Sequence, residues 1–318
     1  MAAIPIWKDK IVDLGTSSVD FRITADGVVI YTGRAIARPG ESTAKVRINE
    51  ICADYLLMTL PSFLDRTFTS FSLPTFVVQK KPSSTWNTVE TVTFYNDLSY
   101  DYNFAGDTLS FPINGRLDSR MAILTSKKNL SGNVTATYKK SNGTTTTRTT
   151  TVSPTPNDGT SSFVVSAVSD TVEVTVNGNT YKVVTDCSKY CLVYVNAYGG
   201  WDQFLIEGND IEADSLQRFI REQEYNNNTP TNAGKVNYVT EVNKGWTFHS
   251  GWLTDVQASR MHHLLDSCLV YLVDNATKAT LPVIITTNTA EYKTFKNQGR
   301  QAVNYTFTVE LAQNRIRR

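Results

Sequence analysis

Three histidines are the side chains of this 318-residue sequence whose ordinary pKa lies nearest to neutral pH. His249 stands between Trp246 and Trp252 in a glycine-flanked stretch that would suit a small pocket. A pair of aromatic strands leading into a helix explains the same pattern more simply, and we favour it. His262 and His263 are neighbours on a predicted helix, so their side chains point about 100° apart and at most one can face a site.

The cysteines and acidic residues give a weak signal for metal chemistry. Cys187 and Cys191 have the spacing of half a zinc site, but no second pair follows them. We therefore expect Cys187 in a turn, and Cys191 and Cys268 as small core residues. The acidic stretch from Ile206 to Asp214 lacks the alternating oxygen ligands of a calcium loop, and the solvated start of a helix accounts for it. We predict no metal site and no other cofactor.

Catalytic motifs are missing from the sequence. It contains no Gly-x-Ser-x-Gly elbow, phosphate-binding loop, dinucleotide fingerprint or His-Glu-x-x-His pair. A glycosidase would need two carboxylates across a cleft, and none of the 30 acidic residues is singled out by its spacing. We predict that the chain is not an enzyme. A polysaccharide-cleaving enzyme is the alternative, and loss of activity on mutating one carboxylate pair would identify it.

Charge and hydropathy exclude two kinds of partner. The formal net charge is +1 and no run of Lys or Arg exceeds two residues, which argues against a nucleic-acid partner. The N-terminal residues lack the basic start and apolar stretch of a secretion signal. No apolar run reaches the length that crosses a bilayer. We expect a protein that is made in a cytoplasm, stays soluble and does not insert into a membrane.

Turn residues between alternating stretches predict three β-hairpins. The turns are Asp26–Gly27 between strands at 19–24 and 28–31, Asn142–Gly143 between 133–138 and 144–152, and Asn177–Gly178 between 172–176 and 180–184. The last two have the residues typical of type I′ turns. Further strands are expected near 72–78, 88–95, 190–196, 203–206, 269–273, 281–285 and 305–311.

Two or three short helices are expected among these strands. Asn49 is expected to cap the first, with Ile51, Tyr55 and Leu56 facing inward. An acidic amphipathic helix is predicted over 212–225, with Leu216, Phe219 and Ile220 on its inner face. The strongest signal predicts a helix over 254–268, which opens with a capping box of Thr254 and Gln257. Its apolar face would consist of Val256, Met261, Leu264, Leu265 and Cys268.

A dozen or so strands and few helices predict a mainly β protein made of two antiparallel β-sandwich or barrel domains. The turn at Asn114–Gly115 is the expected boundary, giving an N-terminal β domain at 1–115 and a C-terminal β-sandwich domain at 116–318. The length is sufficient for two cores.

A hairpin at about 131–152 is expected to protrude from the C-terminal domain. Its second strand, from Thr144 to Thr151, carries almost nothing apolar, so it is either a solvated edge or an arm that pairs with a neighbouring subunit. Tyr and Trp residues elsewhere suit either a protein interface or stacking on sugars. The interface candidates are Tyr138, Thr144, Thr146, Arg148, Thr150, Tyr198, Trp201, Asp202, Tyr100 and Tyr102.

Three stretches resemble tail proteins of tailed bacteriophages, particularly those that infect gut Bacteroidetes. They are residues 30–56, residues 192–202 with Leu-Val-Tyr-Val-Asn-Ala-Tyr-Gly-Gly-Trp-Asp, and the segment from Gly251-Trp-Leu to the final Tyr-Thr-Phe-Thr-Val-Glu-Leu-Ala. Their motifs cover well under half of the chain and contain no catalytic signature.

The resemblance implies a distal-tail or baseplate-like structural protein. Its N-terminal domain would form a ring, commonly a hexamer, and its second sandwich would face outward. The implied partners are further copies of the chain, other phage tail proteins and a host surface glycan, and the implied location is the virion tail. Two alternatives stay open: a carbohydrate-binding β-sandwich module, and a structural protein of the capsid or the region near the portal.

Overall fold

The structure of the chain is a computed structural model. The described residues are 4–6, 9–59, 74–95, 115–118, 122–128, 132–152, 160–166, 170–176, 178–184, 189–195, 201–206, 211–222, 235–258, 260–274, 277, 279–287, 302–312 and 315–317. Asn114 at the expected domain boundary lies outside them.

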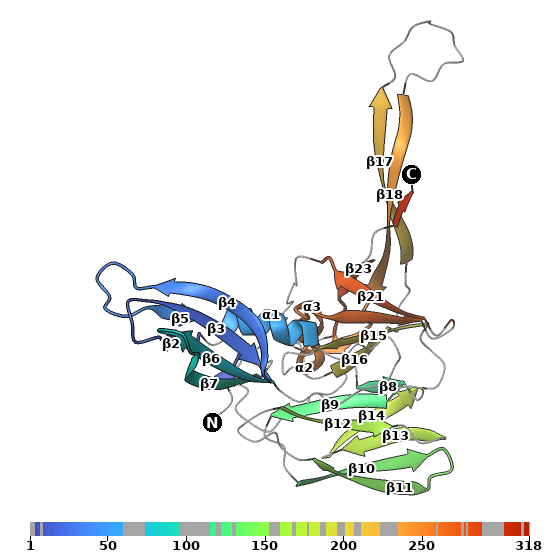
Figure 1. Ribbon diagram of the computed structural model, residues 1–318. Helices are drawn as coiled ribbons and strands as arrows, with labels where there is room; N and C mark the ends of the chain where they lie inside the picture. The colour runs from blue at the N-terminus through green and yellow to red at the C-terminus, as the bar shows by residue number, and fades with distance from the viewer. Residues whose placement is uncertain are drawn as a thin grey trace, which may run out of the picture. The chain divides into compact units, whose positions relative to one another are not determined.

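The predicted fold class is confirmed, because the protein is mainly β, with mostly antiparallel sheets and short helices (Figure 1). In the described part of the chain the sheets are not closed into barrels, which is consistent with β-sandwich domains. Contacts divide the chain into two compact units, 1–185 with 195–202, and 186–194 with 203–318. Among the described helices, none has the length and apolar character needed to span a membrane.

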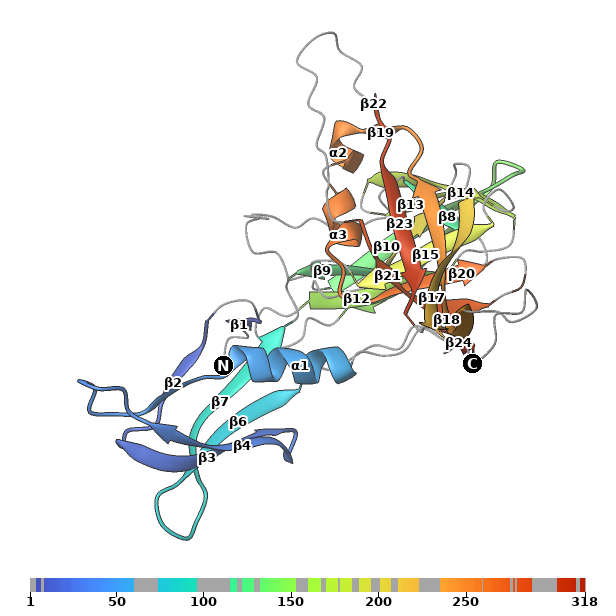
Figure 2. The ribbon, with the colours of Figure 1, turned by 90° about the horizontal axis from the view of Figure 1, so that it is seen from above.

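The first unit begins with a five-stranded sheet in the order β1-β7-β6-β3-β4. The strands are β1 (Ile4–Pro5), β3 (Ser18–Ala25), β4 (Val28–Ile36), β6 (Thr75–Lys81) and β7 (Asn87–Tyr95). β2 (Ile11–Asp13) and β5 (Lys45–Arg47) form a small antiparallel pair. Helix α1 (Asn49–Thr59) lies across one face of the larger sheet (Figure 2).

The predicted hairpin of β3 and β4 is present, and its turn is of type I′. Ala25 lies opposite Val28, so Asp26 and Gly27 alone form the loop, and their φ angles are 46° and 86°. Positive φ at both positions gives the turn a twist that matches the flanking strands. The Thr75 amide also donates to Asp26 Oδ1 over 2.8 Å, which attaches the turn to the start of β6.

Helix α1 closes the core of this sheet, as its pattern predicted. Leu56 is buried, and Ile51 and Tyr55 are partly buried against the same core. Cys52 is fully buried, and burial raises the pKa of its thiol to about 12. Asn49 is the first helical residue, and its Oδ1 accepts a hydrogen bond from Arg47 Nε over 3.2 Å. The buried core comprises Ile6, Val12, Leu14, Val19, Phe21, Ile23, Ala25, Ala35, Ala44, Ile48, Cys52, Leu56, Phe76, Val78, Val92 and Phe94.

The first unit also contains a second five-stranded sheet in the order β11-β10-β13-β14-β8. Its strands are β8 (Arg116–Asp118), β10 (Gly132–Lys140), β11 (Thr145–Val152), β13 (Thr171–Val176) and β14 (Asn179–Val184). β9 (Ala122–Lys128) pairs with β12 (Thr160–Ser166). Both hairpins expected here, β10–β11 and β13–β14, are therefore confirmed.

The turn between β10 and β11 is not of the predicted type I′. Its loop has three residues, with the Gly143 amide donating to the Lys140 carbonyl and the Lys140 amide donating to the Thr144 carbonyl. Gly143 has a φ of +83°, whereas Asn142 is not among the residues with positive φ. A three-residue hairpin loop of this kind is a β-turn followed by a left-handed glycine. The Asn142 side chain accepts from the Thr144 amide over 2.9 Å, so it stabilises the loop instead of adopting positive φ itself.

The second unit is built on an eight-stranded sheet in the order β16-β15-β20-β21-β23-β18-β17, with β24 paired to β18. The strands are β15 (Tyr190–Val195), β16 (Trp201–Leu205), β17 (Ile211–Glu222), β18 (Lys235–His249), β20 (Val270–Asp274), β21 (Thr280–Ile285), β23 (Thr306–Leu311) and β24 (Arg315–Arg317). β19 (Leu253–Thr254) and β22 (Ala302–Val303) form a separate pair. Every residue of β15 is buried, as in a strand covered on both faces.

The predicted helix over 212–225 is wrong, because 211–222 form strand β17. Leu216, Phe219 and Ile220 have the spacing of a helix face, but β17 pairs with β18 from Ile211 to Glu222, and that long-range pairing decides the conformation.

The helix predicted over 254–268 is two short helices, α2 (Asp255–Ala258) and α3 (Met261–Leu265). Its capping box is confirmed, since the Thr254 amide donates to Gln257 Oε1 over 2.9 Å and the Gln257 amide donates to Thr254 Oγ1 over 3.4 Å. Cys268 lies beyond α3 and is exposed, so its expected place in the core is wrong. Cys191 is buried as predicted, and Cys187 lies outside the described residues.

Candidate assembly surface

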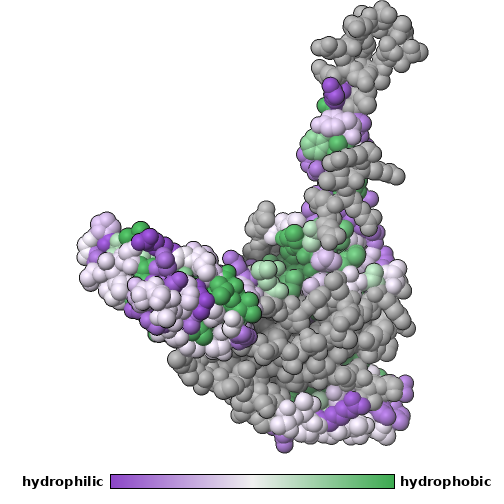
Figure 3. Space-filling view, viewed as in Figure 1, coloured by the Kyte–Doolittle hydropathy of each residue, from purple (hydrophilic) through white to green (hydrophobic). Residues whose placement is uncertain are grey.

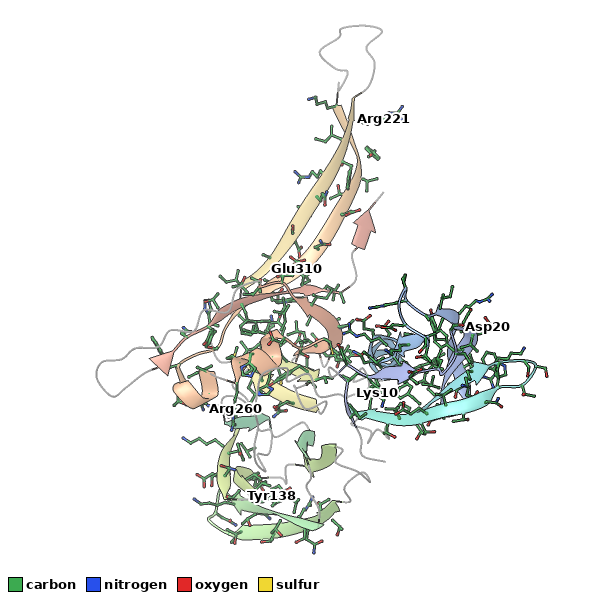
Figure 4. The ribbon with its side chains drawn as sticks, turned by 90° about the vertical axis from the view of Figure 1, so that its left-hand side faces the viewer. Lys10, Asp20, Tyr138, Arg221, Arg260 and Glu310 are labelled. Carbon is green, nitrogen blue, oxygen red and sulfur yellow. The ribbon has the colours of Figure 1, made fainter. Side chains whose placement is uncertain are left out.

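The most unusual surface of the second unit is a two-stranded ribbon, here called the arm, formed by β17 and residues 235–244 of β18. β18 pairs with β23 from Gly245 to His249 and with β24 from Thr240 to Val242. The residues at its start, 235–239, are paired in the described structure with β17 alone. The ribbon therefore continues beyond the sheet, and Figure 4 shows Arg221 near its far end and Glu310 where the sheet meets its base.

Large apolar side chains of the arm are exposed to solvent. The exposed fractions are 57% for Ile211, 51% for Leu216, 58% for Ile220 and 55% for Tyr238. Figure 3 shows such hydrophobic residues on the arm among hydrophilic ones. Because successive strand residues face opposite sides and 211–218 are all exposed, both faces of β17 are open to water. A two-stranded ribbon with both faces solvated is marginally stable by itself, so it would gain stability from packing against another surface.

An ionic cluster fixes the base of the arm. Glu212 on β17 accepts a hydrogen bond from the hydroxyl of Tyr190 on β15. Its carboxylate also forms ion pairs with Lys189 at 3.0 Å and Lys244 at 3.4 Å. The Tyr190 hydroxyl, followed by Lys189, lowers the pKa of Glu212 to about 2. The group therefore stays ionised near neutral pH, which suits a fixed anchor better than a general acid.

Aromatic rings surround this cluster. The Tyr190 ring lies 6.4 Å from that of Trp246 and 5.7 Å from that of Phe248, both on β18. The ammonium groups of the two lysines lie over aromatic rings, Lys189 at 4.5 Å from Tyr190 and Lys244 at 5.1 Å from Trp246. Burial, and then the Glu212 carboxylate, raise the pKa of Tyr190, so the phenol remains a hydrogen-bond donor. The cluster was not predicted from the sequence, where its members lie on three separated segments.

A second open edge belongs to β11 in the first unit. β11 is the outermost strand of its sheet, and residues 145–151 are all exposed. Thr151 Oγ1 donates to Asn133 Oδ1 over 2.9 Å, and the hydroxyls of Thr135 and Thr149 lie 3.4 Å apart. The strand is thus attached to β10 while its own side chains remain outside the core. An exposed edge in the single chain fits both alternatives for this strand, so a solvated edge and an arm that pairs with a neighbour both stay predictions.

Five of the predicted interface residues lie on or beside this edge. Tyr138 is 2% exposed, and burial raises the pKa of its hydroxyl. The guanidinium of Arg148 lies 5.8 Å from the Tyr138 ring centre. Thr146 and Thr150 are exposed on β11 to either side of Arg148, and Thr144 is exposed in the turn. The four exposed residues are available to a partner, whereas Tyr138 is buried on β10, directly opposite Thr146.

The other predicted interface residues do not extend this surface. Asp202 on β16 is 5% exposed, and only the backbone of Trp201 is described. Tyr100, Tyr102 and Tyr198 lie outside the described residues.

The histidines differ from expectation. His262 and His263 were expected to point apart, but both are buried and their rings stack with centroids 4.5 Å apart. Burial lowers the pKa of both, to about 3 for His263, so both are neutral at pH 7. His249 Nδ1 lies 2.9 Å from Thr306 Oγ1 on the neighbouring strand, and Trp252 is 77% exposed. His249 is therefore part of a strand pair, as favoured above.

Among the described residues, no three His, Cys, Asp or Glu side chains gather closely enough to hold a metal ion. No protein family model matches the sequence, and no curated protein matches it significantly.

Proposed function

We propose that this chain is a non-enzymatic structural protein of a bacteriophage tail. It would be a tail-tip or baseplate component that forms a closed ring and links the tail to host-recognition proteins. The observation that supports this most is the arm, a ribbon with an open β17 edge and exposed Leu216 and Ile220. Such a ribbon suits a subunit that completes its packing through assembly.

The open β11 edge supports the same proposal. In a cyclic ring each subunit contacts its two neighbours through two different surfaces, and these two surfaces must be complementary. The arm and the β11 edge are two chemically different surfaces, one partly apolar and one rich in threonine. An exposed strand edge pairs readily with a strand of another chain, since its backbone groups are unpaired.

The location is tested by labelling purified phage particles with antibodies raised against this chain and imaging them by electron microscopy. The proposal predicts label at the distal end of the tail. Label at the head or near the portal would favour the capsid alternative, and particles without label would contradict a virion role. Antibodies against an unrelated host protein of similar size are the control.

A further inference from the structure

The outer face of the N-terminal sheet carries a straight row of polar side chains that the proposed tail function does not use. Thr32, Arg22, Gln79 and Thr88 lie opposite one another on β4, β3, β6 and β7. They alternate with residues such as Phe21 that are buried on the core side. Each of the four is at least partly exposed, so the row is accessible from solvent.

The guanidinium of Arg22 is held in place at the centre of this row. Its Nε donates to Gln79 Oε1 over 2.7 Å, and Gln79 Nε2 in turn donates to Thr88 Oγ1 over 3.4 Å. Its Cζ lies 4.5 Å from the ring centre of Trp86, which immediately precedes β7. The guanidinium is therefore held by its Nε and by the face of the Trp86 ring. Its two terminal nitrogens can then donate together to a bidentate acceptor such as a carboxylate.

The surrounding charge favours an anion. No carboxylate among the described residues forms an ion pair with Arg22. Lys81 lies nearby, with Nζ 5.7 Å from the Trp86 ring centre. In the next row, Asp20 lies opposite both Lys81 and Arg34, and its carboxylate is 4.0 Å from Arg34 Nε. Asp20 is labelled on this sheet in Figure 4. This part of the sheet therefore has three cationic side chains and one carboxylate, that of Asp20. The cations are Arg22, Arg34 and Lys81.

We propose that this face, called the Arg22 platform and comprising Arg22, Thr32, Gln79, Lys81, Trp86 and Thr88, binds an acidic polysaccharide. A uronate carboxylate would accept two hydrogen bonds from Arg22, and Lys81 would add attraction to a second acidic unit. The hydroxyls of Thr32 and Thr88 and the amide of Gln79 match the neutral hydroxyl groups of sugar rings on either side. This mixture favours an acidic glycan over an acidic peptide, which offers carboxylates without ring hydroxyls.

The test is isothermal titration calorimetry of the full chain with an oligogalacturonate, a neutral oligogalactan of equal length and a poly-glutamate peptide. Arg22→Lys keeps the charge but removes the planar fork, and Arg34→Lys makes the same change on the same sheet where the arginine already has Asp20. We expect the uronate to bind the wild type and the Arg34→Lys variant alike. Arg22→Lys should weaken it by about tenfold, the equivalent of one lost charge-assisted hydrogen bond.

Circular dichroism verifies that both variants remain folded. Uronate binding that is lost selectively in Arg22→Lys, with no binding of the neutral glycan, would support the site. Absence of uronate binding at low salt, equal affinity in the two variants, or tighter binding of poly-glutamate would each overturn it. Because the readout is glycan affinity, these results do not depend on whether the chain forms a ring.

Discussion

The hydroxyl of Tyr190 on β15 donates a hydrogen bond to the carboxylate of Glu212 on β17, although β20, β21, β23 and β18 lie between these strands in the sheet. The sheet must curl strongly for its distant strands to meet in this way, in keeping with the twist that sheets acquire. Rings from β15 also contact rings on β18, so the contact belongs to a packed interior and not to a single surface pair. It connects the base of the arm to the buried strand of the unit.

Glu212→Gln should loosen the base of the arm. Glutamine keeps the size of the side chain but loses the charge that attracts Lys189 and Lys244. We expect a loss of about 1 kcal/mol, which would raise the amide hydrogen-exchange rates of 213–217 by about fivefold. Asp214→Asn removes the same charge two residues away and is the control. Equal exchange in the two variants would show that the cluster does not anchor the arm.

Acid should destabilise the second unit through its buried histidines. Burial lowers the pKa of His263 from 6.5 to about 3, so between these values the unfolded chain binds a proton that the folded chain does not. The free energy of unfolding therefore falls as pH falls from 6.5, by at most about 1.4 kcal/mol per pH unit for one such group. Glu212, whose pKa is lowered from 4.5 to about 2, adds a further loss below pH 4.5.

Comparison of wild type and His263→Gln isolates the histidine contribution. Denaturant melts followed by tryptophan fluorescence between pH 6.5 and 4.5 avoid the range in which Glu212 titrates. In the variant the free energy of unfolding should depend less steeply on pH. Part of the pH dependence should remain, because burial also lowers the pKa of His262. His249→Gln, which replaces a partly exposed histidine on β18, is the matched control for the loss of an imidazole that is not buried. An unchanged slope in His263→Gln would contradict a buried neutral imidazole.

Ile220→Asn should weaken self-association. Ile220 on the arm and Ile284 on β21 are each 58% exposed, so replacing either removes the same amount of accessible apolar surface. If the arm docks on a neighbour, the dissociation constant should rise about tenfold for Ile220→Asn, as expected when a partly buried apolar side chain leaves an interface. Ile284→Asn should leave it unchanged in sedimentation velocity experiments. Equal changes in the dissociation constant for the two variants would show that the arm is not part of the interface.

Thr149→Lys tests the β11 edge in the same assay. A lysine on an exposed edge strand opposes pairing with another strand, because the charge would have to be desolvated. Thr137 on β10 is partly exposed but is paired on both sides, with Thr147 on β11 and Thr175 on β13, so Thr137→Lys is the control. We expect reduced oligomer only for Thr149→Lys. Normal oligomers from that variant would leave β11 as a solvated edge.

Local signals in the sequence predicted local structure well. The Asp26–Gly27 turn, the capping box of Thr254 and Gln257 and the buried strand β15 each depend on a few neighbouring residues, and each is present. Most strand positions follow in the same way, because alternation along a strand is itself local.

The arm and its anchor depend on contacts that no local pattern records. Leu216, Phe219 and Ile220 imitate a helix face, and only pairing with β18 makes that segment a strand. Glu212 meets Tyr190 and Lys244 because the sheet curls, which cannot be read from their spacing. Four of the predicted interface residues lie on the edge strand β11 or in the turn before it, and none lies on the longer ribbon of β17 and β18, since exposed apolar residues in a sequence resemble core residues.

The mass of the full chain in solution tests the central claim most directly. Light scattering coupled to size exclusion should be measured over a concentration series, at moderate ionic strength and near neutral pH. A closed ring predicts one oligomer of fixed mass, with a hexamer as the expected size, in equilibrium with monomer at low concentration. A mass of one chain, 35.4 kDa, at every concentration would contradict self-assembly through the arm and the β11 edge.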